Sequence, residues 1–217
     1  LAQNPAGLLR LLSDFRVTHT AMPNFALHLM TTRVRPKDAE GLDLSALEVV
    51  VLGAEPIRPA NIVNFCERYA STGLRPGAMC PAFGLAEHVL AVTGRQDRDM
   101  AAYPMFLRAD PAALRDNRFE ATTAADGIDI CEAGQPGASV TLVIVDPVEL
   151  TERPPGHIGE IWVASPSVTG EYFGPNAADA TRDTFHAELP AHPGQRFMRT
   201  GDLGFIHQGH LFISGCP

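Results

Sequence analysis

Helix-like and strand-like patterns alternate through the first 94 residues of this 217-residue chain. Three stretches are helix-like, the first and third of them with apolar residues at helical spacing, and three short apolar runs lie between or after them. The helix-like stretches are 8–15, 24–34 and 59–69, and the strand-like runs are 17–21, 47–53 and 78–83. This order is typical of a parallel sheet with covering helices, so we predict an α/β fold for this part. Pro59 supports the third helix, because a proline is tolerated in a first helical turn.

The second half of the chain follows a different pattern. Residues 95–137 are polar and lack a sustained period, apart from a short helix-like stretch at 111–115, and loops of this length are often functional or mobile. Beyond them, the predicted strands are 139–145, 158–164, 195–199, 203–206 and 211–214. A helix at 177–185 with Asn176 as its N-cap interrupts these strands. We therefore predict an α/β subdomain at 1–94, an insertion-like segment at 95–137, and a β-rich, barrel-like subdomain at 138–217.

The balance of charge and hydrophobicity excludes several classes of partner. The chain has 17 basic and 25 acidic residues and no basic cluster, so we expect neither nucleic acid nor an anionic membrane as a partner. The longest apolar run, 49–54, is far too short to span a bilayer, and no signal-peptide pattern opens the sequence. A cytoplasmic location follows as an expectation. Both ends interrupt predicted elements, so we interpret the sequence as an excerpt of a longer protein.

Cysteine and histidine residues are dispersed along the sequence. The four cysteines are Cys66, Cys80, Cys131 and Cys216. They show no C-x-x-C spacing, so we expect free thiols instead of disulfides or a zinc site. The eight histidines form no metal-binding pattern either. His207 and His210 flank a predicted hairpin turn, where we expect solvated side chains.

Two short motifs carry residues suited to a nucleotide and a metal ion. In the stretch 79–87, which reads M-C-P-A-F-G-L-A-E, Phe83 offers an aromatic face and Gly84 lets backbone approach a ligand closely or adopt a positive φ. Glu87 is a hard oxygen ligand of the kind that magnesium prefers. In the motif Thr200-Gly201-Asp202, the carboxylate can accept hydrogen bonds from two ribose hydroxyls. The structural alternative for the first motif is a strand end followed by a turn, and the alternative for the second is an Asx turn.

Gly53-Ala54-Glu55 and Phe83-Gly84 each follow a predicted parallel strand. Open parallel sheets bind ligands at the carboxyl ends of their strands, so we expect both loops to face one crevice. The small residues Gly53 and Ala54 leave room for backbone against a purine, with the Phe83 ring on its other face. From these residues alone, a tight strand-to-loop turn is the favoured explanation. Glu55 is compatible with a supporting carboxylate or a solvated loop charge, and its role stays open.

Together the motifs resemble those of the adenylate-forming superfamily of acyl and aryl ligases. In that superfamily an aromatic-Gly-x-(Thr/Ala)-Glu element and a T-G-D element flank one ATP site. The closest similarity is to the fatty acyl-AMP ligase branch, and it runs through nearly the whole chain. The matching stretches are M-P-N-F-A at 22–26, V-L-G-A-E-P-I-R-P at 51–59, F-G-L-A-E at 83–87 and G-E-I-W-V at 159–163. The resemblance implies the latter part of the large N-terminal domain of such an enzyme.

The resemblance also implies a function and a set of site residues. The expected reaction uses ATP and Mg²⁺ to activate a fatty acid as an acyl-adenylate for transfer to a thiol of an acyl carrier protein or polyketide synthase. Nucleotide contacts are implied at Gly53, Ala54, Phe83, Gly84, Leu85, Ala86 and Asp202, magnesium at Glu87, and the acyl pocket at Pro23, Asn24 and Phe25. A Pro-Asn-Phe helix start is equally compatible with capping and core packing. Residues 95–137 fall where this branch carries an extra segment that limits movement of the C-terminal domain.

Several features depart from the family pattern. Ala86 replaces the superfamily's usual threonine, as is common in this branch, so one phosphate contact must come from elsewhere. Cys216 stands where an arginine is expected, and the G-E-Y-F stretch at 170–173 shifts a glycine. The glycine-rich phosphate loop and the C-terminal domain with its catalytic lysine would lie outside these 217 residues. We therefore expect no catalytic residue and no turnover in the excerpt alone. The alternatives are a long-chain fatty acyl-CoA ligase and a non-catalytic lipid- or nucleotide-binding homologue.

Overall fold

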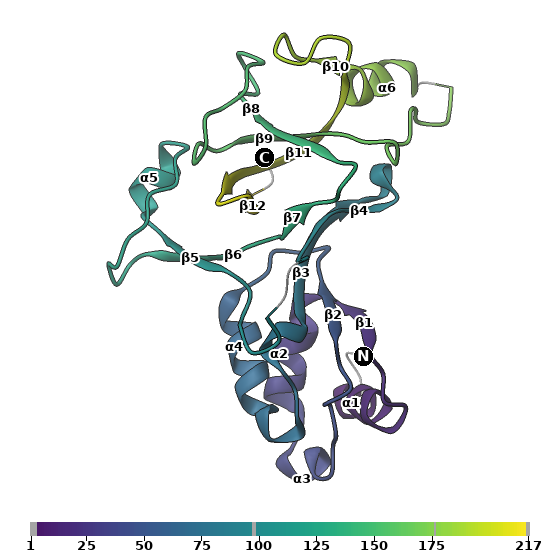
Figure 1. The fold of residues 1–217 in the computed structure, drawn as a ribbon, viewed down its shortest axis with the longest axis vertical. Helices are drawn as coiled ribbons and strands as arrows, with labels where there is room; N and C mark the ends of the chain where they lie inside the picture. Colours follow the sequence, from purple (N-terminus) through teal and green to yellow (C-terminus); the bar gives the residue numbers. More distant parts are fainter. Residues whose placement is uncertain (1–3, 97–98, 176, 216–217) are drawn as a thin grey trace.

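The computed structural model describes residues 4–96, 99–175 and 177–215, and two main sheets organise them (Figure 1). The first sheet has the strand order β1-β2-β3-β4-β7. Its strands are β1 (His19–Met22), β2 (Val49–Leu52), β3 (Met79–Leu85), β4 (Leu90–Gly94) and β7 (Gln135–Pro136). β1, β2 and β3 are parallel, whereas β4 and β7 run antiparallel to their neighbours.

Helices cover the parallel part of this sheet, as the alternating pattern predicts. They are α1 (Pro5–Asp14), α2 (Asn24–Arg33), α3 (Pro36–Ala39) and α4 (Pro59–Arg68), with 3₁₀ turns η1 (Ala70–Thr72) and η2 (Pro76–Ala78). Helices α2 and α4 lie side by side in Figure 1 and contact each other. Leu27, Met30 and Phe65 from these helices are buried in one core with Val50 of β2. Pro59 opens α4, so the predicted helix start is confirmed.

The strand that contains Phe83 is longer than the sequence pattern predicts. β3 continues to Leu85, turns through the 3₁₀ segment η3 (Ala86–His88), and returns as β4, which we did not predict. Phe83-Gly84 therefore lies inside a strand, not in a loop. No glycine, proline or asparagine marks the hairpin turn. Instead Val89 and Leu90 hold positive φ angles of 54° and 80°, which are uncommon for such side chains, and this explains the missed turn.

The second sheet is antiparallel and has the strand order β10-β11-β9-β8, with β12 paired to β11. Its strands are β8 (Thr141–Val145), β9 (Gly159–Ala164), β10 (Ala187–Glu188), β11 (Arg196–His207) and β12 (His210–Gly215). The runs 195–199 and 203–206 are one strand, β11, with an irregularity between Arg199 and Leu203. Helix α6 (Ala177–Phe185) contacts β11, and the predicted cap Asn176 lies outside the described residues.

Segment 95–137 is more ordered than its composition predicts. β5 (Phe106–Ala109) and β6 (Ile128–Cys131) pair as a separate two-stranded antiparallel sheet, so this stretch is not the single long loop that its sequence pattern indicates. Helix α5 (Pro111–Arg115) matches the predicted helix, and the Asp110 side chain caps it. The Phe119 ring stacks on Phe205 of β11 at 4.9 Å between ring centroids. These long-range contacts order a stretch that has no local periodicity.

The segment is also joined to the second sheet through a buried carboxylate. Glu132 follows β6, and its side chain is only 1% exposed. One oxygen lies 3.6 Å from Arg95 Nε, and the other contacts His210 Nδ1 in β12. His207, on the other side of the turn, lies edge-on against Phe119. The expectation that both histidines are solvated is therefore wrong, because each contacts residues of segment 95–137.

Burial makes two of the described cysteines unreactive. Cys66 and Cys131 are free thiols, and both are buried, as is Cys80. Burial raises the pKa of the Cys66 thiol to about 12 and also raises that of Cys131, so both stay protonated at neutral pH. Cys216, which replaces an expected arginine, lies outside the described residues. Among the described helices, none is long and apolar enough to cross a membrane.

Candidate functional site

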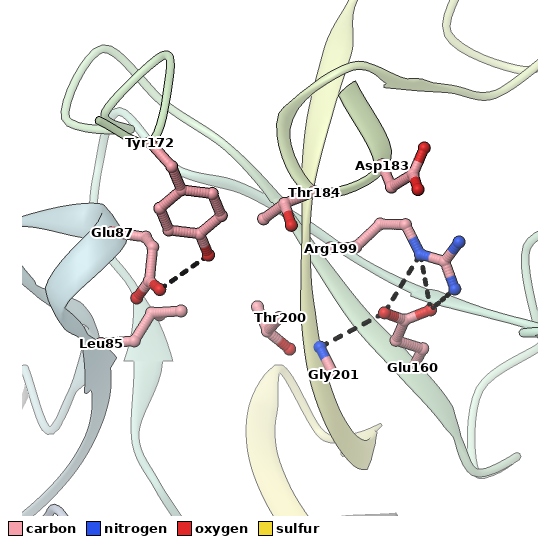
Figure 2. Close-up of a pocket in the computed structure, with 9 residues that line it drawn as sticks. All are labelled: Leu85, Glu87, Glu160, Tyr172, Asp183, Thr184, Arg199, Thr200 and Gly201. Atoms are coloured by element: carbon pink, nitrogen blue, oxygen red, sulfur yellow. Dashed lines mark hydrogen bonds and ion pairs between the residues drawn. The ribbon is translucent and has the colours of Figure 1, made fainter. Parts of the chain in front are cut away.

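A pocket of about 320 Å³ lies between the β3–β4 hairpin and the second sheet (Figure 2). Its lining comes from both halves of the chain: Leu85, Glu87, Glu160, Tyr172, Asp183, Thr184, Arg199, Thr200 and Gly201. Leu85 and Glu87 belong to the first predicted motif, and Thr200 and Gly201 to the second. The fold thus brings two motifs together that are more than a hundred residues apart in sequence.

Glu87 forms one wall of the pocket, and a second segment holds it there. The Tyr172 hydroxyl donates a hydrogen bond to Glu87 Oε1 at 2.9 Å, and the Thr169 backbone N–H donates to the Glu87 carbonyl at 2.8 Å. Burial and the hydrogen bond to Glu87 together raise the pKa of the Tyr172 hydroxyl. The Tyr172 hydroxyl therefore stays protonated at neutral pH and can donate to Glu87.

The donor set fits one particular mode of metal binding. Within the described part of the chain, no three His, Cys, Asp or Glu side chains are grouped so that they could hold a metal ion. A complete protein cage is therefore ruled out for the described residues. Magnesium is usually held by one or two carboxylates together with substrate phosphates, and it keeps several waters. A single carboxylate on a pocket wall, as at Glu87, fits that shared mode.

The opposite wall is a bulge in β11. Arg199 pairs with Trp162 of β9 and Leu203 pairs with Glu160, so residues 200–202 lie opposite Ile161 alone. Gly201 adopts a φ of 77°, which glycine tolerates readily. The Thr200 hydroxyl donates to the Ile161 carbonyl at 2.8 Å and accepts from the Asp202 N–H at 3.1 Å. Bulges of this kind occur often beside active sites, where they redirect a side chain, and here the redirected residues include Asp202.

Glu160 fixes this bulge from the neighbouring strand. Its carboxylate accepts from Arg199 Nε at 3.1 Å, from Arg199 Nη2 at 2.8 Å and from the Gly201 N–H at 3.2 Å. The Arg199 guanidinium also lies over the Trp162 ring, 5.4 Å from its centroid. Such charge-assisted, two-pronged pairs are strong and geometrically specific. The Thr200-Gly201-Asp202 turn therefore has a defined shape before any ligand binds.

Residues 1–173 match the model of a protein family described as AMP-binding enzyme. The chain belongs to the AMP-binding enzyme family. A fatty acyl-adenylate ligase from Legionella pneumophila, solved in complex with acyl adenylate and pyrophosphate, has the same fold with a TM-score of 0.90. It is 30% identical, and the match covers 99% of this chain and 37% of that one.

Two further relatives of this AMP-binding chain are similar over nearly all of its length. The medium-chain-fatty-acid–[acyl-carrier-protein] ligase JamA of Moorena producens is 36% identical over 215 residues, which are 97% of this chain. The long-chain-fatty-acid–AMP ligase FadD26 of Mycobacterium tuberculosis is 36% identical over 219 residues, or 98% of this chain. The chain spans 36% of the length of each of these relatives. It corresponds to part of the N-terminal domain of adenylate-forming enzymes.

In this AMP-binding chain, the loop after β2 lies beside β3. The parallel pairing of the two strands ends at Leu52 and Pro81. A Cβ atom on Gly53 would lie 3.0 Å from the Ala82 carbonyl oxygen, which is close packing. Ala54 adopts a φ of 64°, and such strain in a non-glycine residue is frequent at functional sites. Of the residues predicted to contact the nucleotide, the described lining of the pocket in Figure 2 includes Leu85 but not Gly53, Ala54, Phe83, Gly84, Ala86 or Asp202. The nucleotide contacts of these residues stay a prediction.

The structure gives Glu55 a role that the sequence leaves open. Its Oε1 accepts a hydrogen bond of 2.6 Å from the Phe25 N–H in the first turn of α2. A carboxylate is stabilised at this position because it satisfies a free N–H at the positive end of the helix. Asn24 is 4% exposed and Phe25 is 46% exposed. The bond connects the segment predicted to border the acyl pocket with the loop predicted to contact adenine.

Sequence reasoning did not assign site roles to several pocket residues. These are Glu160, Tyr172, Asp183, Thr184 and Arg199. Glu160 carried a usable signal, since it is a carboxylate inside an otherwise apolar strand-like run. Asp183 and Thr184 lie in helix α6, which the sequence predicts well. Which face of this helix lines the pocket depends on how α6 packs on β11.

Proposed function

We propose that the complete protein activates a fatty acid as an acyl-adenylate and transfers the acyl group to the thiol of a carrier protein, either an acyl carrier protein or a polyketide synthase domain. In the first step a carboxylate oxygen attacks the α-phosphorus of ATP, and pyrophosphate leaves. In the second step the thiol sulfur attacks the acyl carbon, and AMP leaves. We further propose that the protein acts in the cytoplasm. Family membership and the likeness to a ligase solved with acyl adenylate support this function.

One observation carries the proposal to these residues. Glu87 and the bulge residues Thr200 and Gly201, which directly precede Asp202, line opposite sides of a single pocket. We propose that Asp202 accepts hydrogen bonds from the ribose hydroxyls. Bound magnesium, held by Glu87 together with phosphate oxygens, would supply positive charge against the charge that develops in phosphoryl transfer. Because Ala86 has no hydroxyl, the residues described here supply no side-chain donor at that position.

The remaining assignments follow from the loops beside this pocket. We propose that Phe83 stacks on one face of the adenine, with the backbone of Gly53 and Ala54 on the other, and that Gly84, Leu85 and Ala86 complete the contact. We propose that Pro23, Asn24 and Phe25 border the acyl chain. The hydrogen bond from the Phe25 N–H to Glu55 supports this arrangement, because it joins the proposed acyl subsite to the proposed adenine subsite.

We also propose three functional parts, with boundaries at 94/95 and 137/138. The first part would supply the adenine-binding loops and the third the ribose-binding bulge. The ordered segment 95–137 lies between them, and Glu132 connects it to β12 near the end of the chain. In this proposal the segment restricts movement of a following domain, which disfavours thioester formation with CoA.

Replacement of Asp202 with alanine should weaken binding of a non-hydrolysable acyl-adenylate analogue at least about tenfold, or 1.4 kcal/mol, because two charge-assisted hydrogen bonds are lost. Calorimetric titration of the complete natural protein measures this affinity. Asp126→Ala is the matched control, since Asp126 is exposed in segment 95–137 and away from the pocket. Equal affinities for Asp202→Ala and the unaltered protein would remove Asp202 from the nucleotide site.

The reaction itself is tested by the products formed from ATP, Mg²⁺ and a long-chain fatty acid. The complete natural protein should release pyrophosphate, accumulate acyl-AMP and form little acyl-CoA when CoA is added. Chromatography of the radiolabelled fatty acid separates these products. Rapid formation of acyl-CoA would favour the acyl-CoA ligase alternative. Absence of pyrophosphate release, with retained binding of the adenylate analogue, would favour a non-catalytic homologue.

A further inference from the structure

We propose that Tyr172 is a positioning residue that holds the Glu87 carboxylate in the orientation required by the magnesium–nucleotide complex. The inference rests on the proposed function, since it concerns the same pocket. It adds Tyr172, from the second half of the chain, to the proposed magnesium site at Glu87, which belongs to the first half. Tyr172 itself is not proposed to contact the reacting atoms.

The position of Tyr172 is fixed by helix α6. Its backbone N–H donates to the Thr181 hydroxyl at 3.0 Å, and its ring lies 5.0 Å from that of Phe185, at the end of the same helix. Phe185 is buried in the core of the second sheet. The Tyr172 ring is thus anchored at two points on an ordered element, and its hydroxyl faces Glu87 in Figure 2. Such anchoring makes the hydroxyl a fixed reference for the carboxylate.

The segment that carries Glu87, by contrast, has little support of its own. η3 is a single 3₁₀ turn followed by two residues, Val89 and Leu90, with positive φ and exposed side chains. Among the described residues, the Tyr172 hydroxyl is the one hydrogen-bond partner of the Glu87 carboxylate. A glutamate side chain has three rotatable bonds, so an unheld carboxylate would occupy several orientations. The Tyr172 hydrogen bond selects one of them.

This contact uses only one carboxylate oxygen. Oε1 accepts from Tyr172, whereas Oε2 is left for a ligand in the pocket. A neutral donor also orients the carboxylate without cancelling its charge. A lysine or arginine at this position would cancel that charge.

The test is calorimetric titration of Mg²⁺ into the complete natural protein saturated with a non-hydrolysable ATP analogue. Tyr172→Phe removes only the hydroxyl and keeps the ring on Phe185. We expect the Kd for Mg²⁺ to rise about five- to tenfold, while the affinity for the analogue without Mg²⁺ stays unchanged, because only ordering of the carboxylate is lost.

Two controls make the outcome decisive. Tyr69→Phe also deletes a tyrosine hydroxyl, one that donates to the Met30 carbonyl at 2.8 Å in the core, so it should lower the Tm without changing the Kd for Mg²⁺. If Glu87→Gln weakens Mg²⁺ binding but Tyr172→Phe does not, the positioning role is overturned and the proposed function stands. If Glu87→Gln leaves Mg²⁺ binding unchanged, the magnesium assignment of Glu87 fails, and the role of Tyr172 fails with it.

Discussion

Replacement of Glu132 with alanine is expected to lower the free energy of unfolding by about 3–5 kcal/mol, because it leaves a buried arginine without its counter-charge. The Arg95 side chain is 8% exposed, and Glu132 is its one acidic partner among the described residues. Glu132 also accepts from the Met105 N–H at 2.7 Å and contacts His210. The substitution therefore removes one carboxylate and strands three donors, Arg95 and Met105 in segment 95–137 and His210 in β12.

Arg95 cannot relax easily to compensate for this loss. Its Nη1 donates to the Met79 carbonyl at 3.3 Å, and its Nη2 donates to the carbonyls of Ala102 and Tyr103 at 3.3 and 3.0 Å. These bonds hold the guanidinium at the junction of β3 with segment 95–137. The charge would therefore stay buried after the carboxylate is removed, and the cost of its desolvation would remain.

Urea titration of the complete natural protein, with hydrogen exchange followed in peptides from β6 and β12, measures the effect of Glu132→Ala. Asp129→Ala is the matched control, because it breaks an ion pair with Arg108 whose side chains are 54% and 37% exposed, Asp129 first. Exposed pairs contribute about 0–1 kcal/mol, so this control should change little. Equal costs for the two substitutions would show that the Arg95–Glu132 contact does not hold the segment in place.

The parts of the fold that the sequence predicts correctly are those governed by local periodicity. Helices α1 and α4 and the parallel strands between the helices follow apolar spacing, and α5 matches a short helix-like stretch. The family resemblance, carried by short motifs, is confirmed by the comparisons and places the chain in the correct fold.

The parts that were missed depend on contacts between distant segments. β4 begins after two non-glycine residues with positive φ, which only the surrounding sheet can impose. β5 and β6 are short strands whose pairing brings together residues more than 15 positions apart. His210 lies beside a turn, and its environment is set by Glu132, 78 residues earlier. No local pattern carries these relationships.

The candidate site shows the same division. Glu87 and the Thr200-Gly201-Asp202 motif were found as motifs, because their chemistry is legible in the residue types. The supporting residues Tyr172 and Glu160 were not, since a tyrosine in a loop and a carboxylate in a strand have many uses. Their roles follow from hydrogen bonds that only the tertiary structure creates. Tyr172 donates to Glu87 at 2.9 Å, and Glu160 accepts from the Gly201 N–H at 3.2 Å.

Gly84→Ala should destabilise the β3–β4 hairpin nearly as much as Glu132→Ala destabilises the protein. We expect it to lower the free energy of unfolding by about 3 kcal/mol, the upper end of typical overpacking costs. A Cβ atom at this position would lie 1.7 Å from the Leu90 carbonyl oxygen and 2.6 Å from its carbon. Both atoms belong to backbone, so neither can rotate away as a flexible side chain can. The φ of Gly84 is not positive, so the glycine is required by the neighbouring strand and not by a left-handed conformation.

Gly94→Ala in the same hairpin provides the matched control. Nothing lies within 4 Å of a Cβ atom built on Gly94, and its φ is not positive, so this substitution should change the stability by less than about 1 kcal/mol. Hydrogen exchange of the β3–β4 peptides in the complete natural protein distinguishes the two variants. Because Leu85 and Glu87 extend from this hairpin into the pocket, Gly84→Ala should also displace Glu87 and weaken Mg²⁺ binding, whereas Gly94→Ala should not. Normal protection of the hairpin in Gly84→Ala would mean that the register of β3 and β4 around Leu90 differs from the one described here.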